Sequence, residues 1–249
     1  MKLKSLGFFL LITLLFSCQE KKHQAGICLS FDDRSIKEWF ALRDLFNEYG
    51  VKATFFVTQF DSLSAEEIEM LHTLEKDGHE IASHGALHID AEKTIKKYSY
   101  KEYFKTEIDP SITSMKKSGF EPVSFAYAYG TKYRFTDYLL LKKFKCTRGV
   151  ADMRKEKDLS KHNEIFYSYD HNRKFISALI DRAGNVNDEM ISRAINRASE
   201  RNEVLMIFGH VPSETAVNEY SFDVNFLKSI LEKAKSKQLK FYRFKDLVK

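Results

Sequence analysis

Short apolar runs alternate with longer amphipathic stretches along nearly all of this 249-residue chain. Runs such as residues 26–31, 52–57 and 203–208 have the length of buried strands, whereas the stretches between them have helical length and periodicity. Strands that alternate with helices usually pair in parallel, with the helices outside the sheet. Because no linker or internal repeat divides the sequence, about seven parallel strands predict a single α/β domain, a distorted (β/α) barrel.

One region departs from this alternation. Residues 151–188 have no clear period, and only residues 164–169 within them are predicted as a strand.

The first two predicted helices begin with a serine that a glutamate follows three residues later, the spacing of a capping box. The other predicted strands are residues 26–31, 52–57, 79–83, 122–130, 145–150, 203–208 and 240–244, and the predicted helices are residues 35–50, 64–78, 134–144, 189–202, 223–238 and a longer helix from Ser99 with a break or kink at Pro110.

The first eighteen residues resemble a targeting signal. Two lysines precede a short apolar core, and a small residue stands before Cys18, as in a signal peptide. Residues 15–18 (LFSC) resemble the lipobox of bacterial lipoproteins, in which the cysteine is lipidated. We therefore predict a signal peptide at residues 1–18, a linker at 19–25, a catalytic domain at 26–249 and a lipid anchor on Cys18 that holds the exported protein to a membrane of the bacterial cell envelope. Simple secretion and an uncleaved N-terminal anchor are the alternatives.

Composition limits the other classes of protein. The formal charge of +5 is spread along the chain without a recognisable nucleic-acid-binding motif, so we expect no nucleic-acid partner. Cys28 and Cys146 both fall in predicted strands, where they are either buried thiols or, in an exported protein, a disulfide pair. No cysteine spacing indicates a structural zinc site, and the sequence does not specify an oligomeric state.

Chemically useful residues gather at the predicted strand ends. In parallel barrels the active site lies at the carboxyl ends of the strands. These ends carry an adjacent pair of acids, several histidines and an arginine: Asp32, Asp33, Ser83, His84, Tyr129, Gly130, Arg148, Asp170 or a neighbour, Gly209 and His210. The rule therefore places two acids, histidines and an arginine at one mouth of the barrel.

The paired acids and two of the histidines suggest a metal site. Asp32 and Asp33 could favour the start of the following helix, but next to a metal one carboxylate can be a ligand and the other a free base. His84 and His88 stand four residues apart, a spacing that is weak by itself. Two histidines and one aspartate form a three-ligand set that leaves an open position for water, as catalytic zinc sites require.

Other residues near the mouth allow two readings. His210 ends an apolar strand, where it could donate a proton to a leaving group or be satisfied by local hydrogen bonds. Trp39 and Tyr127 could stack on sugar rings, although ordinary packing is favoured for both. His79 begins its strand at the opposite mouth, so we assign it to the surface or to packing, and Glu80 receives no role.

Taken in order, these motifs resemble those of the polysaccharide deacetylases, the family with the NodB homology domain. The resemblance runs from about residue 27 to 247 and covers LSFDD at 29–33, HGALH at 84–88, FAYAYG at 125–130 and IFGH at 207–210. It implies a NodB-type barrel, Asp32 as the catalytic base, and Asp33, His84 and His88 as the metal ligands. It also implies that the backbone NH of Tyr129 faces the oxyanion and that His210 is the general acid.

The chain departs from the family pattern at several positions. Arg34 replaces a usual glycine, Gly85 a usual serine or threonine, and Ala126 an arginine that orients the base. Ala128 also replaces a common proline. We expect the orienting charge to come from Arg148, with Arg134 as the second candidate.

The family's fourth motif has an aspartate that contacts this arginine. No segment of the sequence matches this motif clearly, and Asp152 and Asp170 are the candidates.

The resemblance implies a metal-dependent hydrolase that removes acetyl groups from a glycan, most readily the N-acetyl groups of an amino-sugar polymer. One alternative is an esterase that acts on O-acetyl groups of a plant polysaccharide such as acetyl-xylan. Another is a catalytically weak barrel that binds glycan. The predicted metal is Zn²⁺, although a site of two histidines and one carboxylate also accepts Co²⁺, Ni²⁺ or Fe²⁺.

Overall fold

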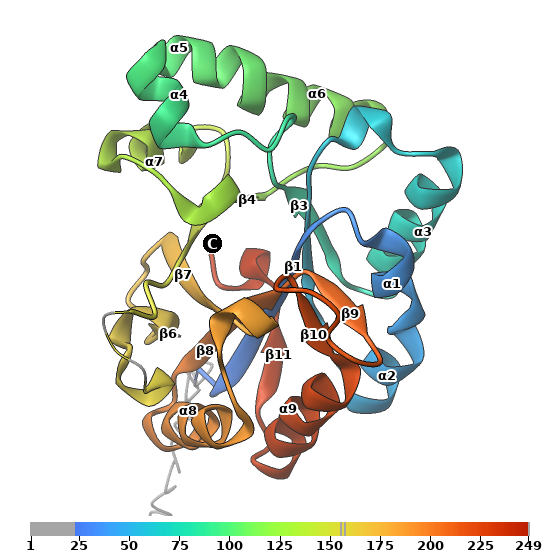
Figure 1. Cartoon of the computed structure of the whole chain (residues 1–249), viewed down its shortest axis with the longest axis vertical. Helices are drawn as coiled ribbons and strands as arrows, with labels where there is room; N and C mark the ends of the chain where they lie inside the picture. The colour runs from blue at the N-terminus through green and yellow to red at the C-terminus, as the bar shows by residue number, and fades with distance from the viewer. Residues whose placement is uncertain (1–22, 155, 157, 249) are drawn as a thin grey trace, which may run out of the picture.

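The computed structural model describes residues 23–154, 156 and 158–248, so the predicted signal peptide and Cys18 lie outside the described residues. The described chain contains a parallel sheet in which β8 also pairs with β1, and this pairing closes the sheet into a barrel (Figure 1). The predicted (β/α) barrel with seven parallel strands is confirmed. Its strands are, in order, β1 (Gly26–Asp33), β2 (Thr54–Val57), β3 (Glu80–Ser83), β4 (Ser124–Ala126), β5 (Cys146–Val150), β7 (Lys174–Leu179) and β8 (Val204–Gly209).

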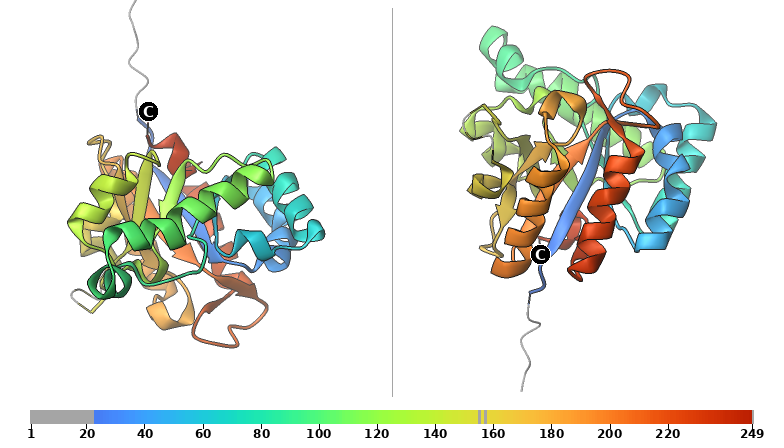
Figure 2. Two further views of the ribbon diagram at one scale, coloured as in Figure 1. Left: turned by 90° about the horizontal axis from the view of Figure 1, so that it is seen from above. Right: turned by 60° about the horizontal axis from the view of Figure 1, so that its bottom comes forward.

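Helices surround the barrel, and most follow a strand as the alternation predicted. In Figure 1 the helices between β3 and β5 gather on one side of the barrel, and Figure 2 shows α8 and α9 packed side by side on another. The helices are α1 (Ile36–Ala41), α2 (Arg43–Tyr49), α3 (Ala65–Lys76), α4 (Ala91–Lys97), α5 (Tyr100–Tyr103), α6 (Asp109–Lys117), α7 (Arg134–Leu140), α8 (Asp188–Arg201) and α9 (Val224–Ser236).

Four further strands are short. The predicted closing strand is β11 (Lys240–Tyr242), which pairs in parallel with the first residues of β1. β6 (Phe166–Tyr167) runs antiparallel to the start of β8, and β9 (Val211–Ser213) and β10 (Ser221–Asp223) form a small separate sheet. The chain after β8 therefore leaves the barrel mouth and returns before α9 begins.

The prediction for residues 151–188 was wrong in its main element. The strand expected at residues 164–169 is reduced to the two residues of β6, and β6 is antiparallel to its neighbour. The strand that completes the barrel is β7, which lies between β5 and β8 and was not predicted. As a result, the strand end that faces the mouth in this region follows Leu179 and not residue 169.

Two helix starts and one kink also test the sequence patterns. Ser64 forms the predicted capping box with Glu67, whereas the Ser35 side chain makes no capping hydrogen bond. The first helix is also divided into α1 and α2 at Leu42. The disturbance expected near Pro110 is a π-helical turn, Phe104–Ile108, directly before α6.

The main hydrophobic core lies between the barrel and the helices that follow β1, β2, β7 and β10. Phe31 of β1 is fully buried there, and its ring centroid lies 5.5–6.4 Å from those of four other aromatic side chains, Trp39, Phe46, Phe55 and Phe222. Packed aromatic side chains bury large apolar areas. Phe31 therefore fixes β1, the strand that leads to Asp32 and Asp33.

The first described residues are attached at the amino end of the barrel. The backbone oxygen of His23 accepts a hydrogen bond from Asn202 (2.7 Å), and that of Gln24 accepts one from the Tyr242 hydroxyl (3.0 Å). Since parallel strands all point the same way, this attachment lies opposite the mouth formed by their carboxyl ends.

Cys28 and Cys146 are both buried and both free, so the disulfide alternative is wrong. Burial raises the pKa of the Cys146 thiol to about 12, which leaves it neutral and unreactive at ordinary pH.

In the described part of the chain, no helix is both long and apolar enough to span a bilayer.

Replacement of Phe31 tests its role in the core. Phe31→Ala should lower the free energy of unfolding by about 3–5 kcal/mol, because it leaves a cavity among four aromatic rings. Tyr138→Ala, which removes an aromatic side chain that is 57% exposed on α7, should change it by about 0.5 kcal/mol or less. Urea unfolding measures both, and equal losses would contradict this description of the core.

Candidate active site

The carboxyl ends of β1 and β8 lie side by side because these strands close the barrel. Phe31 of β1 is in register with Gly209 of β8, so the residue after each, Asp32 and His210, comes to the same part of the mouth. β2 and β3 follow on the other edge of β1, with Val57 in register with Ser83, which places His84 beside the two acids. Barrel closure therefore assembles residues that are 178 positions apart in the sequence, from 32 to 210.

The three predicted metal ligands meet at one point. Ligand atoms of Asp33, His84 and His88 all lie within 4.8 Å of one another. Oδ1 of Asp33 is 3.5 Å from Nε2 of His84 and 3.2 Å from Nε2 of His88. Atoms bound at about 2.0–2.2 Å to one tetrahedral ion lie about 3.3–3.6 Å apart, so these separations suit zinc.

Hydrogen bonding selects the nitrogen that His84 can offer to a metal. Nδ1 of His84 lies 2.9 Å from the backbone oxygen of Ala126, which can only accept a hydrogen bond. The proton therefore resides on Nδ1, and Nε2 directs a lone pair toward Asp33. Oδ1 of Asp33 is buried and has no hydrogen-bond partner among the described residues, and Nε2 of His84 faces it at 3.5 Å. This arrangement fits a bound cation.

The backbone at two ligands is in an unusual conformation. Asp33 has φ 83° and His88 has φ 57°, both in the left-handed region that residues other than glycine seldom adopt. Such strain persists only where the surrounding structure imposes it, and it is common at functional sites.

Asp32 is held by a buried arginine. The Arg148 side chain, wholly inaccessible to solvent, donates a hydrogen bond from Nη2 to Oδ2 of Asp32. Its guanidinium also lies 4.4 Å from the ring centroid of Phe208. The structure thus brings Arg148, the sequence-based candidate for the orienting charge, to Asp32. Oδ1 of Asp32 is buried with no partner among the described residues, which leaves it available to a ligand.

His210 is held by an aspartate that the sequence analysis missed. Oδ2 of Asp181 bonds to Nδ1 of the His210 ring, and Oδ1 accepts the His210 backbone NH at 3.0 Å. Asp181 follows β7, the strand that was not predicted, at the carboxyl end of the barrel. The run KFISALID at residues 174–181 has an acid after an apolar strand, as LSFDD does, and this signal could have identified it.

The two candidates for the fourth motif lie at opposite ends of the barrel. Asp152 follows β5 and is paired with Arg154, with 2.8 Å between Oδ1 and Nε. Asp170 follows β6, which runs toward the start of β8, so it lies at the opposite end of the barrel from the site. Arg134, the second candidate for the orienting charge, begins α7, and the orienting contact is made by Arg148 instead.

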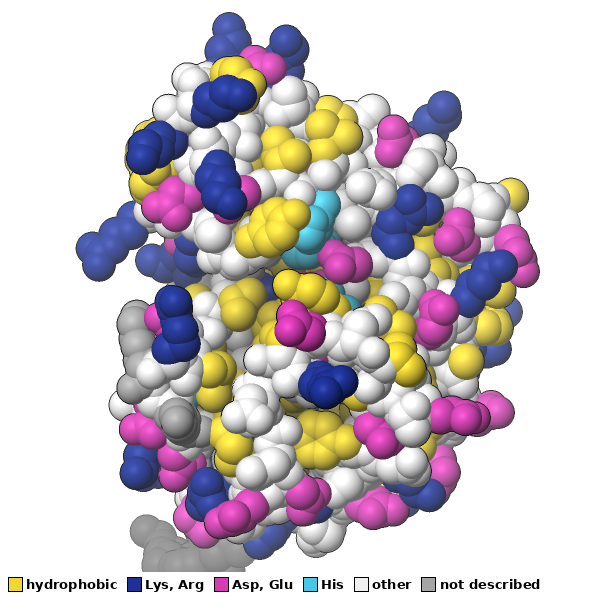
Figure 3. Space-filling model, in the orientation of Figure 1, with side chains coloured by type: hydrophobic (Ala, Val, Ile, Leu, Met, Phe, Trp, Pro, Cys, Tyr) yellow, Lys and Arg dark blue, Asp and Glu magenta, His cyan; other side chains and the backbone are white. Residues whose placement is uncertain are grey.

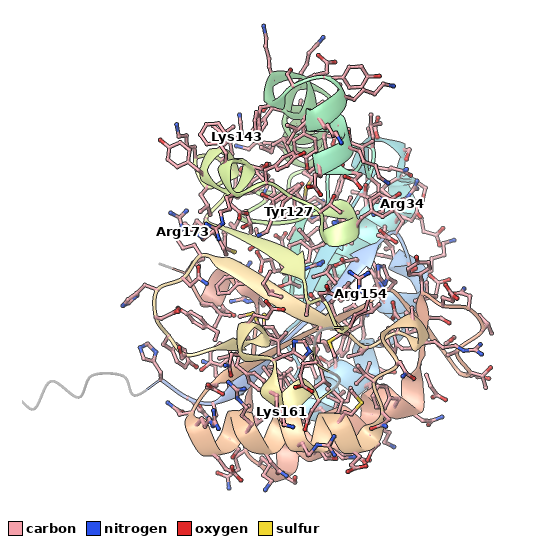
Figure 4. The ribbon with its side chains drawn as sticks, turned by 60° about the vertical axis from the view of Figure 1, so that its left-hand side comes forward. Arg34, Tyr127, Lys143, Arg154, Lys161 and Arg173 are labelled. Carbon is pink, nitrogen blue, oxygen red and sulfur yellow. The ribbon has the colours of Figure 1, made fainter. Side chains whose placement is uncertain are left out.

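Three aromatic residues at the mouth have different exposures. Trp39 is fully buried, and its Nε1 donates to the His210 backbone oxygen at 2.7 Å. Tyr127 is also buried, with its hydroxyl bonded to Asp137, and Figure 4 shows it inside the molecule. Both side chains therefore have the packing role that was favoured for them, and neither is exposed to stack on a sugar ring. Tyr129 is instead 66% exposed, with its ring centroid 4.8 Å from that of His88.

Tyr220 flanks the other side of the site. It is 59% exposed, and its ring centroid lies 5.6 Å from that of His210. Figure 3 shows histidine side chains at the surface near the middle of this face, with hydrophobic and acidic side chains next to them. An exposed aromatic ring therefore stands beside each of two site histidines.

His79 and Glu80 lie at the amino end of β3. The His79 ring is buried against Phe46 and accepts a hydrogen bond from the Ala53 NH at Nδ1, so of the two alternatives, surface or packing, it has the packing role. Glu80 is buried as well and accepts a hydrogen bond from the Ser124 hydroxyl at 2.7 Å.

Electrostatics divide the site into groups with different charge. Burial would raise the pKa of the Asp33 carboxyl, but the imidazoles of His84 and His88 hold it well below its ordinary value. Burial would lower the pKa of His210, but Asp181 and the two acids of β1 raise it above its ordinary value. The site thus pairs an ionised ligand with a histidine that retains its proton to higher pH, as a general acid requires.

The chain is similar to one family model and to several solved structures. A family model described as "Polysaccharide deacetylase" matches residues 19–145, about half of the chain. No curated protein matches the chain.

Solved structures with similar folds include a chitin deacetylase from Colletotrichum lindemuthianum (TM-score 0.60, 14% identity, 91% of this chain and 88% of that one). The Xyl-CE4 domain of a multidomain xylanase from the hindgut metagenome of Trinervitermes trinervoides is also similar (TM-score 0.56, 19% identity, 90% and 89%). A third is the catalytic domain of a peptidoglycan N-acetylglucosamine deacetylase from Eubacterium rectale (TM-score 0.51, 19% identity, 88% of each). At these identities the likeness shows a shared fold.

The contact between Asp181 and His210 predicts a shift in titration. In metal-free protein, Asp181→Asn should lower the pKa of the His210 imidazole, because a negative charge that favours the protonated ring is lost. The variant ring then loses its proton at a lower pH than the wild-type ring, which NMR titration of the histidine resonances measures. Asp188→Asn removes the same charge on the surface of α8, and the pKa of His210 should not move.

Proposed function

The chain belongs to the polysaccharide deacetylase family, and from that membership we propose that it removes N-acetyl groups from an amino-sugar polymer, with a zinc ion held by Asp33, His84 and His88. Membership itself makes it a hydrolase that acts on acetylated carbohydrate. The observation that carries the proposal is the convergence of a three-ligand metal set with two further pairs, Asp32 with Arg148 and His210 with Asp181.

The ligand set supports a divalent metal, and zinc is the proposed ion. Two imidazole nitrogens and one carboxylate oxygen make the usual donor set of catalytic zinc sites with an open coordination position. A bound divalent ion supplies Lewis acidity and lowers the pKa of water toward about 7. Co²⁺, Ni²⁺ and Fe²⁺ suit the same donors.

Two side chains carry out the proton transfers of acetyl hydrolysis, one as the acceptor and one as the donor. Asp32, fixed by Arg148, accepts a proton from the attacking water through its unpartnered Oδ1. The backbone NH of Tyr129 donates to the oxyanion of the tetrahedral intermediate, an interaction worth about 3 kcal/mol in comparable sites. His210 donates its proton from Nε2 to the leaving nitrogen, since Asp181 occupies Nδ1. The products are acetate and a free amine on the sugar.

Two exposed tyrosines support a polymeric substrate. Tyr129 and Tyr220 stand beside His88 and His210 respectively, and aromatic rings at such positions can pack against the apolar faces of sugars. We infer that they contact sugar units on the two sides of the reacting acetyl group. The chitin and peptidoglycan deacetylases of similar fold are consistent with an N-acetylated polymer.

Two alternatives have specific observations behind them. The similarity to a domain of a xylanase supports an O-acetyl ester of a plant polysaccharide, whose hydrolysis passes through a similar oxyanion. The other alternative is a catalytically weak glycan-binding barrel, because Ala126 stands where an orienting arginine is usual. The contact between Arg148 and Asp32 argues against it, because the orienting charge comes from another strand.

We also propose that the protein is exported and anchored to a membrane of the bacterial cell envelope through Cys18. The support is the sequence of residues 1–18, with its basic start, short apolar core and lipobox-like end. Mass analysis of the mature N-terminus would distinguish lipidation at Cys18 from simple secretion and from an uncleaved anchor.

Replacement of Asp32 tests the catalytic assignment. Asp32→Asn should still bind one zinc ion per chain but release acetate about 10²–10⁴-fold more slowly, because the base is lost and the ligands remain. The assay uses chitooligosaccharides, poly-N-acetylglucosamine, peptidoglycan and acetyl-xylan, and the preferred substrate decides between N- and O-acetyl groups. Asp61→Asn removes an exposed carboxylate and should retain full activity. Binding of glycan without turnover by the wild type would favour the binding-only alternative.

Tyr220 tests the polymer contact. Tyr220→Ala should raise KM for a long oligomer about 10-fold with little effect on a short substrate, because it removes a binding surface and leaves the reacting groups in place. Tyr138→Ala removes an equally exposed ring on α7 and should leave KM unchanged. A fall in kcat alone would contradict a binding role for Tyr220.

A further inference from the structure

We propose that Glu107 is a positioning residue for the metal site, whose carboxylate holds the loop from His84 to His88 in its ligating conformation. The inference rests on the proposed metal-dependent function, because it assigns a role to a residue behind the proposed ligands. Glu107 belongs to the π-helical turn between α5 and α6 and is not part of any motif identified in the sequence.

Glu107 accepts hydrogen bonds from three backbone NH groups in and next to the ligand loop. Oε2 of Glu107 accepts the Leu87 NH at 2.7 Å, and Oε1 accepts the Ile89 NH at 3.1 Å. The backbone oxygen of Glu107 accepts the Ala86 NH at 3.0 Å. The two side-chain bonds thus bracket His88, which has φ 57°. Charged hydrogen bonds of this kind are stronger than neutral ones and can hold a residue in a strained conformation.

Gly85 and Glu107 are complementary in shape. Gly85 has φ +85°, and a Cβ placed on it would lie 1.9 Å from Oε1 of Glu107. Any side chain at position 85 would therefore displace the carboxylate. The sequence departs from its family at this position, where a serine or threonine is usual, and the structure gives a physical reason. The volume that a residue-85 side chain would enter is filled by a carboxylate from another part of the chain.

The π-helical turn explains how Glu107 reaches the loop. Pro110 follows this turn and has no NH to donate to the carbonyl four residues earlier, so a regular α-helix cannot continue through it. The wider π turn, Phe104–Ile108, accommodates this interruption, and such turns are frequent at functional sites. It carries Glu107 to the inner side, where the residue is only 1% exposed.

Removal of the Glu107 carboxylate would free the NH groups of Leu87 and Ile89, on both sides of His88, and would release the loop. Loss of the ligating conformation of the loop weakens metal binding.

The first test measures metal affinity directly. Glu107→Ala should weaken Zn²⁺ binding about 10–100-fold in a competition titration with a chromophoric chelator, and should alter the visible absorption of the Co²⁺-substituted protein. Glu107→Gln keeps a single carbonyl acceptor for two NH donors, so its affinity should lie between the wild type and Glu107→Ala. If Glu107→Ala does not fold, Glu107→Gln decides the question.

Glu80→Ala is the matched control. Glu80 is also 1% exposed and accepts backbone and hydroxyl hydrogen bonds, but it lies at the amino end of β3, away from the loop. Glu80→Ala should lower Tm, as Glu107→Ala does, and leave Zn²⁺ affinity and the Co²⁺ spectrum unchanged. This comparison separates loss of loop position from general loss of stability.

Position 85 provides an independent check. Gly85→Ser should weaken Zn²⁺ binding in the wild type, where it meets the carboxylate. It should weaken binding less in the Glu107→Ala background, where the space is free and only the strain of a side chain at φ +85° remains. Equal effects in both backgrounds would show that the two residues are not coupled, and would overturn the inference.

The remaining outcomes separate the two proposals. If the wild type binds one Zn²⁺ and Glu107→Ala binds it equally well with an unchanged Co²⁺ spectrum, the inference fails and the proposed function stands. If the wild type binds no divalent metal, or if His84→Ala binds it as tightly as the wild type, the proposed metal site fails and the inference fails with it.

Discussion

The parallel pairing of β1 with β8 is the constraint on which the site depends. It closes the barrel, and through its register it places the end of the first strand beside the end of a strand formed almost 180 residues later. The base and the proton donor therefore come from strands that share backbone hydrogen bonds. A shift of register by two residues would separate Asp32 from His210 by about 7 Å along the strand direction. The aromatic cluster around Phe31 opposes such a shift, because it holds β1 against α1 and α2.

The orientation of Asp32 and His210 costs the protein stability. Arg148 is wholly buried, yet its Nε and Nη1 have no hydrogen-bond partner among the described residues, and its single carboxylate partner is Asp32. A buried ion pair with unsatisfied donors contributes little to the free energy of folding and is often less favourable than apolar packing. Its value lies in fixing the Asp32 carboxylate in one rotamer. Asp181 orients His210 in the same way, through one hydrogen bond to the ring and one from the backbone NH.

Much of this arrangement was predictable because it follows from local patterns. Asp32, His84 and His210 each stand directly after a short apolar run, so the rule for parallel barrels located them without knowledge of their contacts. Arg148 was found in the same way. Asp181 was missed because β7 was not predicted in residues 151–188. The rule for strand ends could not identify the residue that follows a strand that was not predicted. The pairing of Gly85 with Glu107 could not be predicted, since it joins two segments through space and neither shows a distinctive pattern. The burial of Trp39 and Tyr127 likewise depends on how helices pack against the barrel.

The attachment of residues 23–25 at the amino end of the barrel bears on what the protein can reach. In the lipoprotein that we propose, the described chain begins at the pole of the domain opposite the mouth of the barrel. A linker of residues 19–25 can extend at most about 25 Å, so the domain stays close to the bilayer. Its mouth then faces away from the lipid surface. Such an enzyme is suited to polymer strands that run above the membrane, and glycans attached to the membrane beneath it would be poorly placed for attack.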